Sequence, residues 1–286
     1  MIAKKCVRPD DRSGTAGRVE EAFRNCKERD ESALIVYLTA DDPDGDTSLR
    51  LMRAAAEAGA DVIEIGIPWS DPSADGKAIQ AAMHRALARG GGLRRSLALC
   101  SELRAACPDV GLVLFGYANP ILVMGVDVFA LKARDAGADG LLCVDYPPDE
   151  DRALPAALAR EGLDFVPLLA PTSTDARVDI ALAAAGSFVY YVSMTGITGT
   201  ALGDLAGPRA KVAAIRERGG GKVPVAVGFG IRTPEAARAV ASFADAVVVG
   251  SAAVEIVERA AAAKRDPVPE MSAFVRSLRQ AVVGSG

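Results

Sequence analysis

Short apolar runs recur along the chain and are separated by longer stretches with helical spacing. Apolar side chains fill nearly every position of these runs, which is typical of parallel strands buried on both faces. The stretches between them, such as Ser48–Glu57 and Pro234–Ala241, have the periodicity of helices. The runs predict eight strands: Leu34–Leu38, Val62–Ile67, Leu112–Gly116, Gly140–Val144, Asp164–Leu169, Phe188–Val192, Val223–Gly228 and Ala246–Val249. Eight strands alternating with helices indicate an α/β fold, either a closed barrel or a doubly wound sheet.

A weak repeat favours the closed barrel. Ala-Gly-Ala-Asp occurs at Ala58–Asp61 and again at Ala136–Asp139, each time directly before a predicted strand, and Phe243–Asp245 is a looser echo. A helix, a glycine cap, an aspartate and a strand form a unit that recurs in barrels. The long gap between the second and third strands, 68–110, must hold an extra loop and a helix. Long loops in compact domains are often functional.

One domain accounts for the whole chain. The chain has 286 residues, and a (β/α)8 TIM barrel typically takes ~250 residues. No Pro/Gly-rich linker divides the chain. We therefore expect a single TIM-barrel domain over 1–286. It consists of an N-terminal extension and helix over 1–30 and a barrel over 31–286 that ends in a helix around Glu270–Val282.

Charge and cysteine usage argue against several classes of protein. The formal net charge is −4, from 37 acidic and 33 basic residues mixed along the chain, so a nucleic-acid-binding protein is not expected. The five scattered cysteines and the single histidine, His84, lack the spacing of a zinc site, which predicts reduced thiols in a cytoplasmic enzyme. We expect neither a secretory signal nor a membrane span, because no suitable apolar segment is present.

The second predicted strand carries one acid among aliphatic residues. Side chains of a strand alternate between its two faces, so Ile63, Ile65 and Ile67 share one face and Glu64 lies on the other. The isoleucine face should pack on the surrounding helices, which directs Glu64 into the barrel. Burial raises the pKa of a carboxyl group towards values useful for proton transfer. The alternative is a structural Glu64 that is bonded to a backbone donor or a buried arginine.

Two more acids, Asp71 and Asp75, follow in the loop Pro68–Gly76. Three acids near one strand end could bind Mg²⁺, but no histidine lies nearby, and a pair of carboxylates that divide acid and base roles is the simpler hypothesis. Asp-Pro and Asp-Gly are also common in ordinary turns. We expect no metal.

Glycine-bearing turns follow three late strands. They are Ser193–Gly199, Gly228–Pro234 and Gly250-Ser251, the last of which opens a predicted helix. Glycine allows backbone N–H groups to approach an anion, and a helix N-terminus adds its dipole. Phosphate sites in TIM barrels often use the loops after strands seven and eight. The turns therefore predict a phosphate site, with the Ser251 hydroxyl as a further donor and Tyr190 lining the pocket.

The segment Glu64-Ile-Gly-Ile-Pro-Trp-Ser-Asp-Pro-Ser-Ala-Asp-Gly76 resembles the signature of the tryptophan synthase alpha-subunit family. The resemblance extends over about Leu34 to Glu258 and includes Ile79-Gln-Ala-Ala, Tyr117-Ala-Asn-Pro120, Asp145-Tyr-Pro147, Gly196-Ile-Thr-Gly199 and Gly228-Phe-Gly-Ile231. It implies a lyase that splits indole-3-glycerol phosphate into indole and glyceraldehyde 3-phosphate. It also implies that the chain has no cofactor of its own and that its partner, a beta subunit that binds pyridoxal phosphate, joins it in an alpha2beta2 complex.

The resemblance further implies roles for single residues. Glu64 matches the general acid/base, and Asp75 matches the acid that hydrogen-bonds the indole N–H. Tyr190 matches a positioning tyrosine, and Thr198 matches a mobile-loop threonine that orders Asp75. The residues that match the indole pocket are Tyr37, Tyr117 and Phe229. The residues that match the phosphate site are Gly199, Gly230, Gly250 and Ser251.

Three positions depart from the family pattern. Asp41 stands where glycine is usual, Lys77 stands where proline is usual, and Met194 stands in the mobile loop where other residues are common. In this family, the segments that hold the first two positions face the beta subunit or shape the adjacent loop, so these departures bear on partner choice more than on the reaction. Asp41 and Lys77 therefore leave open a free-standing lyase that releases indole. A second alternative is a catalytically silent barrel that acts as an allosteric subunit, but the presence of both acids and of the phosphate turns argues against it.

Overall fold

The computed structural model describes residues 17–192, 205–228 and 230–283, and a single parallel sheet lies at its centre. The strand order is β5-β4-β3-β2-β1-β9-β8-β7-β6, and every pair of neighbours is parallel. The strands are β1 Ala33–Thr39, β2 Val62–Gly66, β3 Gly111–Gly116, β4 Gly140–Cys143, β5 Asp164–Phe165, β6 Leu168–Leu169, β7 Val189–Val192, β8 Val225–Gly228 and β9 Ala246–Val249.

The fifth predicted strand, Asp164–Leu169, is divided into the two short strands β5 and β6. Val166 N–H donates to the Leu141 carbonyl of β4 at 2.9 Å, whereas the Pro167 carbonyl accepts from Tyr190 N–H of β7 at 2.9 Å. Pro167 has no N–H to donate, which interrupts the ladder between them. Since one continuous segment bonds to β4 on one side and to β7 on the other, it closes the sheet. The predicted (β/α)8 barrel is confirmed, and only the expectation of eight separate strands was wrong.

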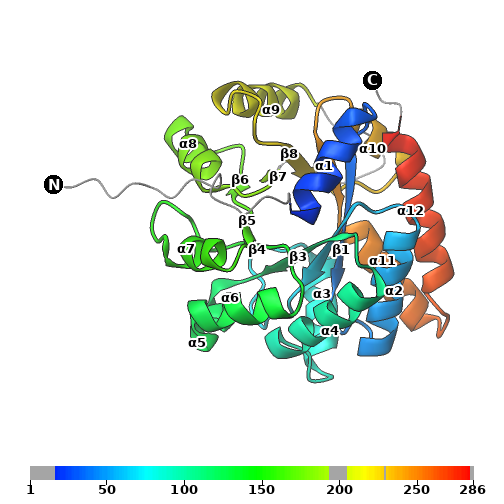
Figure 1. Cartoon of the computed structure of the whole chain (residues 1–286). Coiled ribbons are helices and arrows are strands. Elements are labelled where there is room, and N and C mark those ends of the chain that lie inside the picture. The colour runs from blue at the N-terminus through cyan, green and yellow to red at the C-terminus, as the bar shows by residue number, and fades with distance from the viewer. Residues whose placement is uncertain (1–16, 193–204, 229, 284–286) are drawn as a thin grey trace.

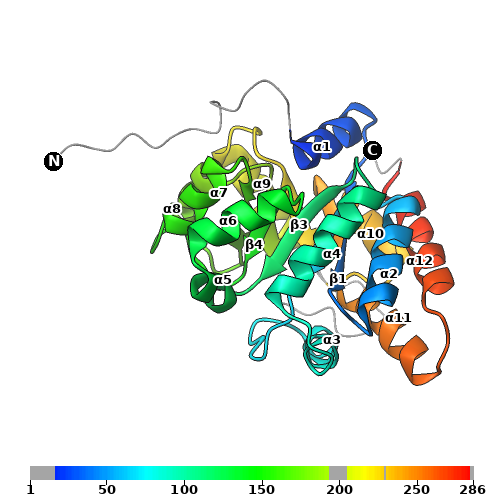
Figure 2. The ribbon, with the colours of Figure 1, turned by 60° about the horizontal axis from the view of Figure 1, so that its bottom comes forward.

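Helices surround the sheet (Figures 1 and 2). They are α1 Arg18–Glu28, α2 Gly45–Glu57, α3 Lys77–Leu87, α4 Leu93–Ala106, α5 Ala118–Met124, α6 Val126–Asp135, α7 Ala153–Arg160, α8 Asp175–Ala184, α9 Ala206–Arg218, α10 Pro234–Ala241, α11 Ser251–Ala262 and α12 Val268–Val282. The long gap after β2 holds both α3 and α4, as expected from its length. The final helix, α12, packs between α2 and α10. In the described part of the chain, no helix is long and apolar enough to cross a membrane.

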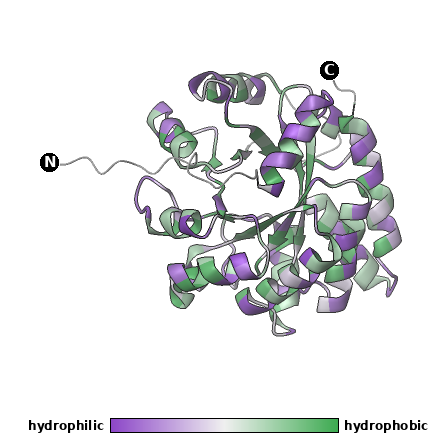
Figure 3. Ribbon diagram, viewed as in Figure 1, coloured by the Kyte–Doolittle hydropathy of each residue, from purple (hydrophilic) through white to green (hydrophobic). Residues whose placement is uncertain are grey.

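The sheet separates two apolar cores. The outer core lies between strands and helices and contains Ile63, Ile65 and Ile67, whereas the inner core fills the barrel and contains Val62 and Val113. Figure 3 shows apolar strands in the centre and surrounding helices that carry both polar and apolar residues. This arrangement confirms the assignment of the two faces of β2, because the isoleucines meet the helices.

Helix α1 covers the end of the barrel where the strands begin. Its buried residues Val19 and Phe23 belong to the inner core, and the rings of Phe23 and Phe188 lie 5.2 Å apart. A Cβ on Gly111, at the start of β3, would come within 2.9 Å of Val19. Glycine at this position therefore allows the helix to approach the strand closely.

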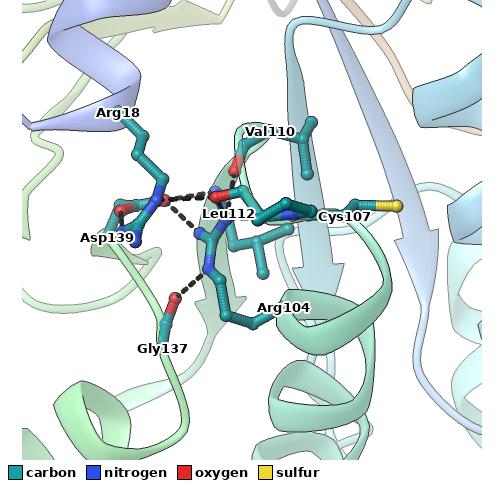
Figure 4. Close-up of polar contacts among 8 residues, drawn as sticks. Arg18, Arg104, Cys107, Val110, Leu112, Gly137 and Asp139 are labelled. Carbon is teal, nitrogen blue, oxygen red and sulfur yellow. Dashed lines mark hydrogen bonds and ion pairs between the residues drawn. The ribbon is translucent and has the colours of Figure 1, made fainter.

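The repeated aspartates tie this same end together. Asp139 accepts the N–H of Leu112 at 2.7 Å, Arg104 of α4 at 2.6 Å and Arg18 of α1 at 3.1 Å (Figure 4). Asp61 accepts the N–H of Leu34 and the guanidinium of Arg279, each at 2.8 Å.

The third copy, Asp245, accepts Val225 N–H at 2.7 Å and binds Arg216 at 2.8 Å. Each aspartate thus joins the strand that follows it to a neighbouring strand and to a helix. This shared role gives the repeat in the sequence a structural reason.

Candidate active site

Glu64 lies in the middle of β2 and points into the barrel. It pairs with Tyr37 of β1 on one side and with Val113 of β3 on the other, and its side chain is 1% exposed. Its Oε1 atom has no hydrogen-bond partner among the described residues. Burial alone raises the pKa of Glu64 from 4.5 to about 8. The carboxyl group is therefore protonated at neutral pH, and the described part of the chain contains neither the backbone donor nor the buried arginine of the structural alternative.

Asp75 lies in the loop between β2 and α3, where Tyr117 holds it. The Tyr117 hydroxyl donates to Asp75 Oδ2 at 2.6 Å and accepts Ala74 N–H at 3.2 Å. Burial raises the pKa of Asp75, and the hydrogen bond from Tyr117 opposes this shift. Gln80 of α3 donates to the Asp75 carbonyl at 2.8 Å, which fixes the backbone of the loop. Its neighbours thus orient this carboxylate, whereas Glu64 Oε1 has no hydrogen-bond partner among the described residues.

Two tyrosines lie near both acids. Burial and the carboxylates of Glu64 and Asp75 raise the pKa values of Tyr37 and Tyr190 well above the ordinary value. The electrostatic influence of both acids on both phenols places the four side chains in one site. It also keeps the two phenols protonated, so that they act as hydrogen-bonding groups and not as bases.

Glycines at two strand ends make room for these tyrosines. A Cβ on Gly66 would lie 2.2 Å from the Tyr37 hydroxyl, and a Cβ on Gly228 would lie 2.3 Å from the Tyr190 hydroxyl. Any larger residue would displace the phenol, because real Cβ contacts are never this short. Sequence reasoning missed this role of Gly66, although its place on the same face as Glu64 was a usable signal.

Sequence reasoning also missed Phe115. Its ring packs edge-on against Tyr37, with centroids 5.1 Å apart, and it belongs to the inner core. Alternation along β3 from Val113, which pairs with Glu64, would have placed Phe115 on the inner face. It extends the aromatic wall beside Glu64 and Asp75.

The structure describes part of the predicted phosphate site. Helix α11 begins at Ser251 with Gly250 as its N-cap, and no side chain caps it. A Cβ on Gly250 would lie 3.5 Å from Tyr37, and a Cβ on Gly76 would lie 4.0 Å from Ser251 Oγ. This uncapped helix start therefore adjoins the loop that carries Asp75, and Gly230 has the positive φ of 61° that favours glycine. The predicted site residues Thr198, Gly199 and Phe229 lie outside the described residues, as does Met194.

The two remaining departures from the family pattern have different structural consequences. Asp41 has φ 61°, a backbone conformation that explains why glycine is usual there, and its buried carboxylate binds Arg95 at 2.9 Å. Lys77 is exposed at the start of α3. The next residue after Asp41, Asp42, is also buried and binds Arg85 of α3 through two contacts of 2.9 Å.

Metal binding finds little support in this arrangement. Asp71 is exposed, and His84 is exposed on α3. Among the described residues, no group of three or more His, Cys, Asp or Glu side chains could hold a metal ion. The arrangement instead offers one protonated carboxyl and one oriented carboxylate, a combination suited to proton transfer at a site walled by aromatic rings.

Comparisons with known proteins agree with this geometry. The family model described as "Tryptophan synthase alpha chain" matches residues 23–283. The tryptophan synthase alpha chain of Burkholderia thailandensis is 47% identical over 268 residues, which are 94% of this chain and 97% of that protein. The crystal structure of tryptophan synthase subunit alpha from Legionella pneumophila has a TM-score of 0.87 at 36% identity and covers 94% of this chain and 99% of that one. An open form of tryptophan synthase from Mycobacterium tuberculosis has a TM-score of 0.81 at 34% identity, covering 93% and 99%.

Proposed function

The chain belongs to the tryptophan synthase alpha chain family, lyases of tryptophan biosynthesis that cleave indole-3-glycerol phosphate, and we propose that Glu64 and Asp75 are its two catalytic acids. The observation that carries this proposal is the state of Glu64. Its side chain is 1% exposed, one oxygen has no partner among the described residues, and its pKa is about 8. Such a group can both give and take a proton near neutral pH.

The cleavage follows from these two environments. Glu64 donates its proton to C3 of the indole ring, and the positive charge that develops on the ring nitrogen is stabilised by the Asp75 carboxylate through the indole N–H. The Glu64 carboxylate then takes the proton of the adjacent glycerol hydroxyl. The bond between the ring and the side chain breaks towards the ring, which yields indole and glyceraldehyde 3-phosphate and leaves Glu64 protonated again. Proton transfer of this kind typically contributes 10²–10⁴-fold to a rate.

The surrounding residues fit the two ends of this substrate. The aromatic wall of Tyr37, Phe115 and Tyr117 suits a flat indole ring. Backbone N–H groups at Gly250 and Ser251, at the start of α11, suit a phosphate, because a helix N-terminus attracts anions. The reaction needs no cofactor in this chain, and we place it in the cytoplasm.

An exposed apolar surface supports a protein partner. Four large apolar side chains on α5 and α6 are exposed: Leu122 at 51%, Val123 at 83%, Val128 at 46% and Leu131 at 41%. Helix α5 begins directly after Tyr117, so this surface adjoins the residue that orients Asp75. Clustered exposed apolar side chains mark protein interfaces. We assign the surface to a beta subunit that carries pyridoxal phosphate, within an alpha2beta2 complex.

The decisive experiment measures indole release from indole-3-glycerol phosphate by the purified chain, with and without a matched beta subunit. Glu64→Gln should lower release at least about 100-fold. Glu57→Gln, an exposed acid on α2 that pairs with Arg53, is the matched control and should leave release unchanged. Slow release that the beta subunit accelerates supports the two-subunit enzyme, whereas rapid release by the chain alone contradicts it and favours a free-standing lyase. Full activity of Glu64→Gln would refute the assignment of the acid.

A further inference from the structure

A cavity lies at the opposite end of the barrel from Glu64. Its volume is about 470 Å³, within the range of small-molecule sites. Helix α1 forms one wall, and the segments that lead into β1, β7, β8 and β9 form the others. Ligand sites of TIM barrels are expected at the carboxyl ends of the strands, so the proposed reaction does not use this cavity.

The buried part of the cavity combines aromatic rings with a hydroxyl that lacks a partner. Phe23 and Phe243 line it and are 5% and 6% exposed. Ser187 also lines it, is 8% exposed, and its Oγ has no hydrogen-bond partner among the described residues. Ser32 is different, because its hydroxyl donates to the carbonyls of Ala241 and Ala244 at 3.1 and 2.8 Å. A buried hydroxyl without a partner is destabilising, and a polar ligand atom at Ser187 would remove this cost.

The charged residues of the cavity fall into two groups. The first group has ion-pair partners: Glu31 binds Arg279 at 2.5 Å, Asp245 binds Arg216 at 2.8 Å, and Arg24 binds Glu21 at 3.3 Å. The second group comprises four exposed residues that line the cavity and have no ion-pair partner in the described part of the chain: the cations Lys27 and Lys222 and the anions Glu20 and Asp30. Unpaired charges of both signs around an aromatic interior match a ligand that itself carries both charges on an apolar body.

We propose that this cavity binds a small zwitterion with an apolar side chain, an α-amino acid of the aromatic or branched aliphatic class. Its carboxylate lies towards Lys27 and Lys222 and accepts the Ser187 hydroxyl, its ammonium group lies towards Glu20 and Asp30, and its side chain lies against Phe23 and Phe243. Since the ligand contacts both α1 and the segments that precede the strands, it stabilises the packing of α1 against the barrel. The site is independent of the proposed reaction, because it shares no residue with the catalytic end.

The test is calorimetric titration of the full chain with L-phenylalanine, L-leucine and L-tryptophan. Three probes each lack one feature of L-phenylalanine: 3-phenylpropanoate has no ammonium group, 2-phenylethylamine has no carboxylate, and glycine has no apolar side chain. At least one of the three apolar amino acids should bind, and its affinity should be at least about tenfold higher than the affinity of each of the three probes. No binding of any of them at about 10 mM, or equal binding of 3-phenylpropanoate, would overturn the proposal.

Variants locate the site and separate binding from folding. Lys27→Glu and Lys222→Glu should each weaken binding, whereas Lys132→Glu, on exposed α6, and Ser251→Ala, at the other end of the barrel, should not. Ser187→Ala should weaken binding about fivefold and yet raise the melting temperature of the free chain, because it removes the unsatisfied hydroxyl. Binding that is lost in Ser251→Ala and kept in Lys27→Glu would place the ligand in the catalytic site and refute the cavity.

Discussion

Replacing Glu64 by glutamine should stabilise the protein in a way that depends on pH. In the folded chain, burial raises the pKa of Glu64 from 4.5 to about 8, whereas the unfolded chain exposes it at its ordinary value. Between these two values the folded state holds a proton that the unfolded state has lost. Stability therefore falls as pH rises from 4.5 to about 8 and is constant with respect to this group outside that window. Glutamine has nearly the same shape and does not titrate, so the variant lacks this penalty.

The size of the effect follows from the gap between the two pKa values. Each pKa unit corresponds to about 1.4 kcal/mol, so the gap between 4.5 and about 8 amounts to about 5 kcal/mol at alkaline pH. At pH 7 the penalty is about 3 kcal/mol. The amide of glutamine adds its own cost of desolvation, about 1–3 kcal/mol, but this cost does not change with pH. The informative quantity is thus the pH dependence of the difference between the two proteins.

Urea unfolding of wild type and Glu64→Gln at pH 5, 6, 7, 8 and 9 measures that difference. The free energy of unfolding of the variant minus that of wild type should increase by roughly 1.4 kcal/mol per pH unit between pH 5 and 8. Above pH 8 this difference should level off. Glu57→Gln, an exposed acid on α2, should show no such slope. A flat difference from pH 5 to 8 would mean that Glu64 titrates normally, and the argument for a buried proton donor would fail with it.

Three further substitutions test other parts of the molecule. Tyr117→Phe removes the 2.6 Å hydrogen bond that lowers the pKa of Asp75. The value of kcat/KM should therefore fall about tenfold, and the acidic limb of its pH profile should move to higher pH. An unchanged pH profile would contradict this role of Tyr117. Asp139→Asn leaves buried arginine charge uncompensated and should lower the free energy of unfolding by about 3 kcal/mol in urea titrations, whereas Asp135→Asn, at an exposed pair, should change it by less than about 0.5 kcal/mol. Val123→Asp should keep its melting temperature but bind a matched beta subunit at least about tenfold more weakly in a titration; undiminished binding would exclude this surface.

Alternation along β2 was sufficient to predict the direction of Glu64. The burial of the three isoleucines against helices leaves only one face for the acid, and no long-range knowledge is needed. The division of the fifth strand was harder to foresee, because Val166 and Pro167 continue the apolar run. The position of Pro167 explains it, since a residue without N–H cannot donate to a ladder in the middle of a sheet.

The contacts that complete the site depend on residues far apart in the sequence. Tyr117 meets Asp75 across 42 positions, and Arg95 meets Asp41 across 54. No local pattern marks either pair, because each contact arises only when the closed barrel brings successive strand ends together. The repeated aspartates were visible as a motif, but their arginine partners on α4, α9 and α12 follow no common spacing. Packing between helices and strands determines these contacts, and the secondary-structure propensity of the individual segments does not.

The barrel uses buried and half-buried carboxylates in opposite ways at its two ends. Where the strands begin, Asp61, Asp139 and Asp245 each accept a backbone N–H and an arginine, so these acids join strands and helices. Nearer the strands' other ends, Glu64 is buried without a compensating cation among the described residues. The resulting cost of about 3 kcal/mol at pH 7 is large beside a total stability of about 5–15 kcal/mol. Such a cost persists only where the rest of the structure offsets it. The aspartate networks contribute to that offset at a distance from the proposed chemistry, so that Glu64 Oε1, which has no partner in the described part of the chain, is able to exchange a proton with substrate.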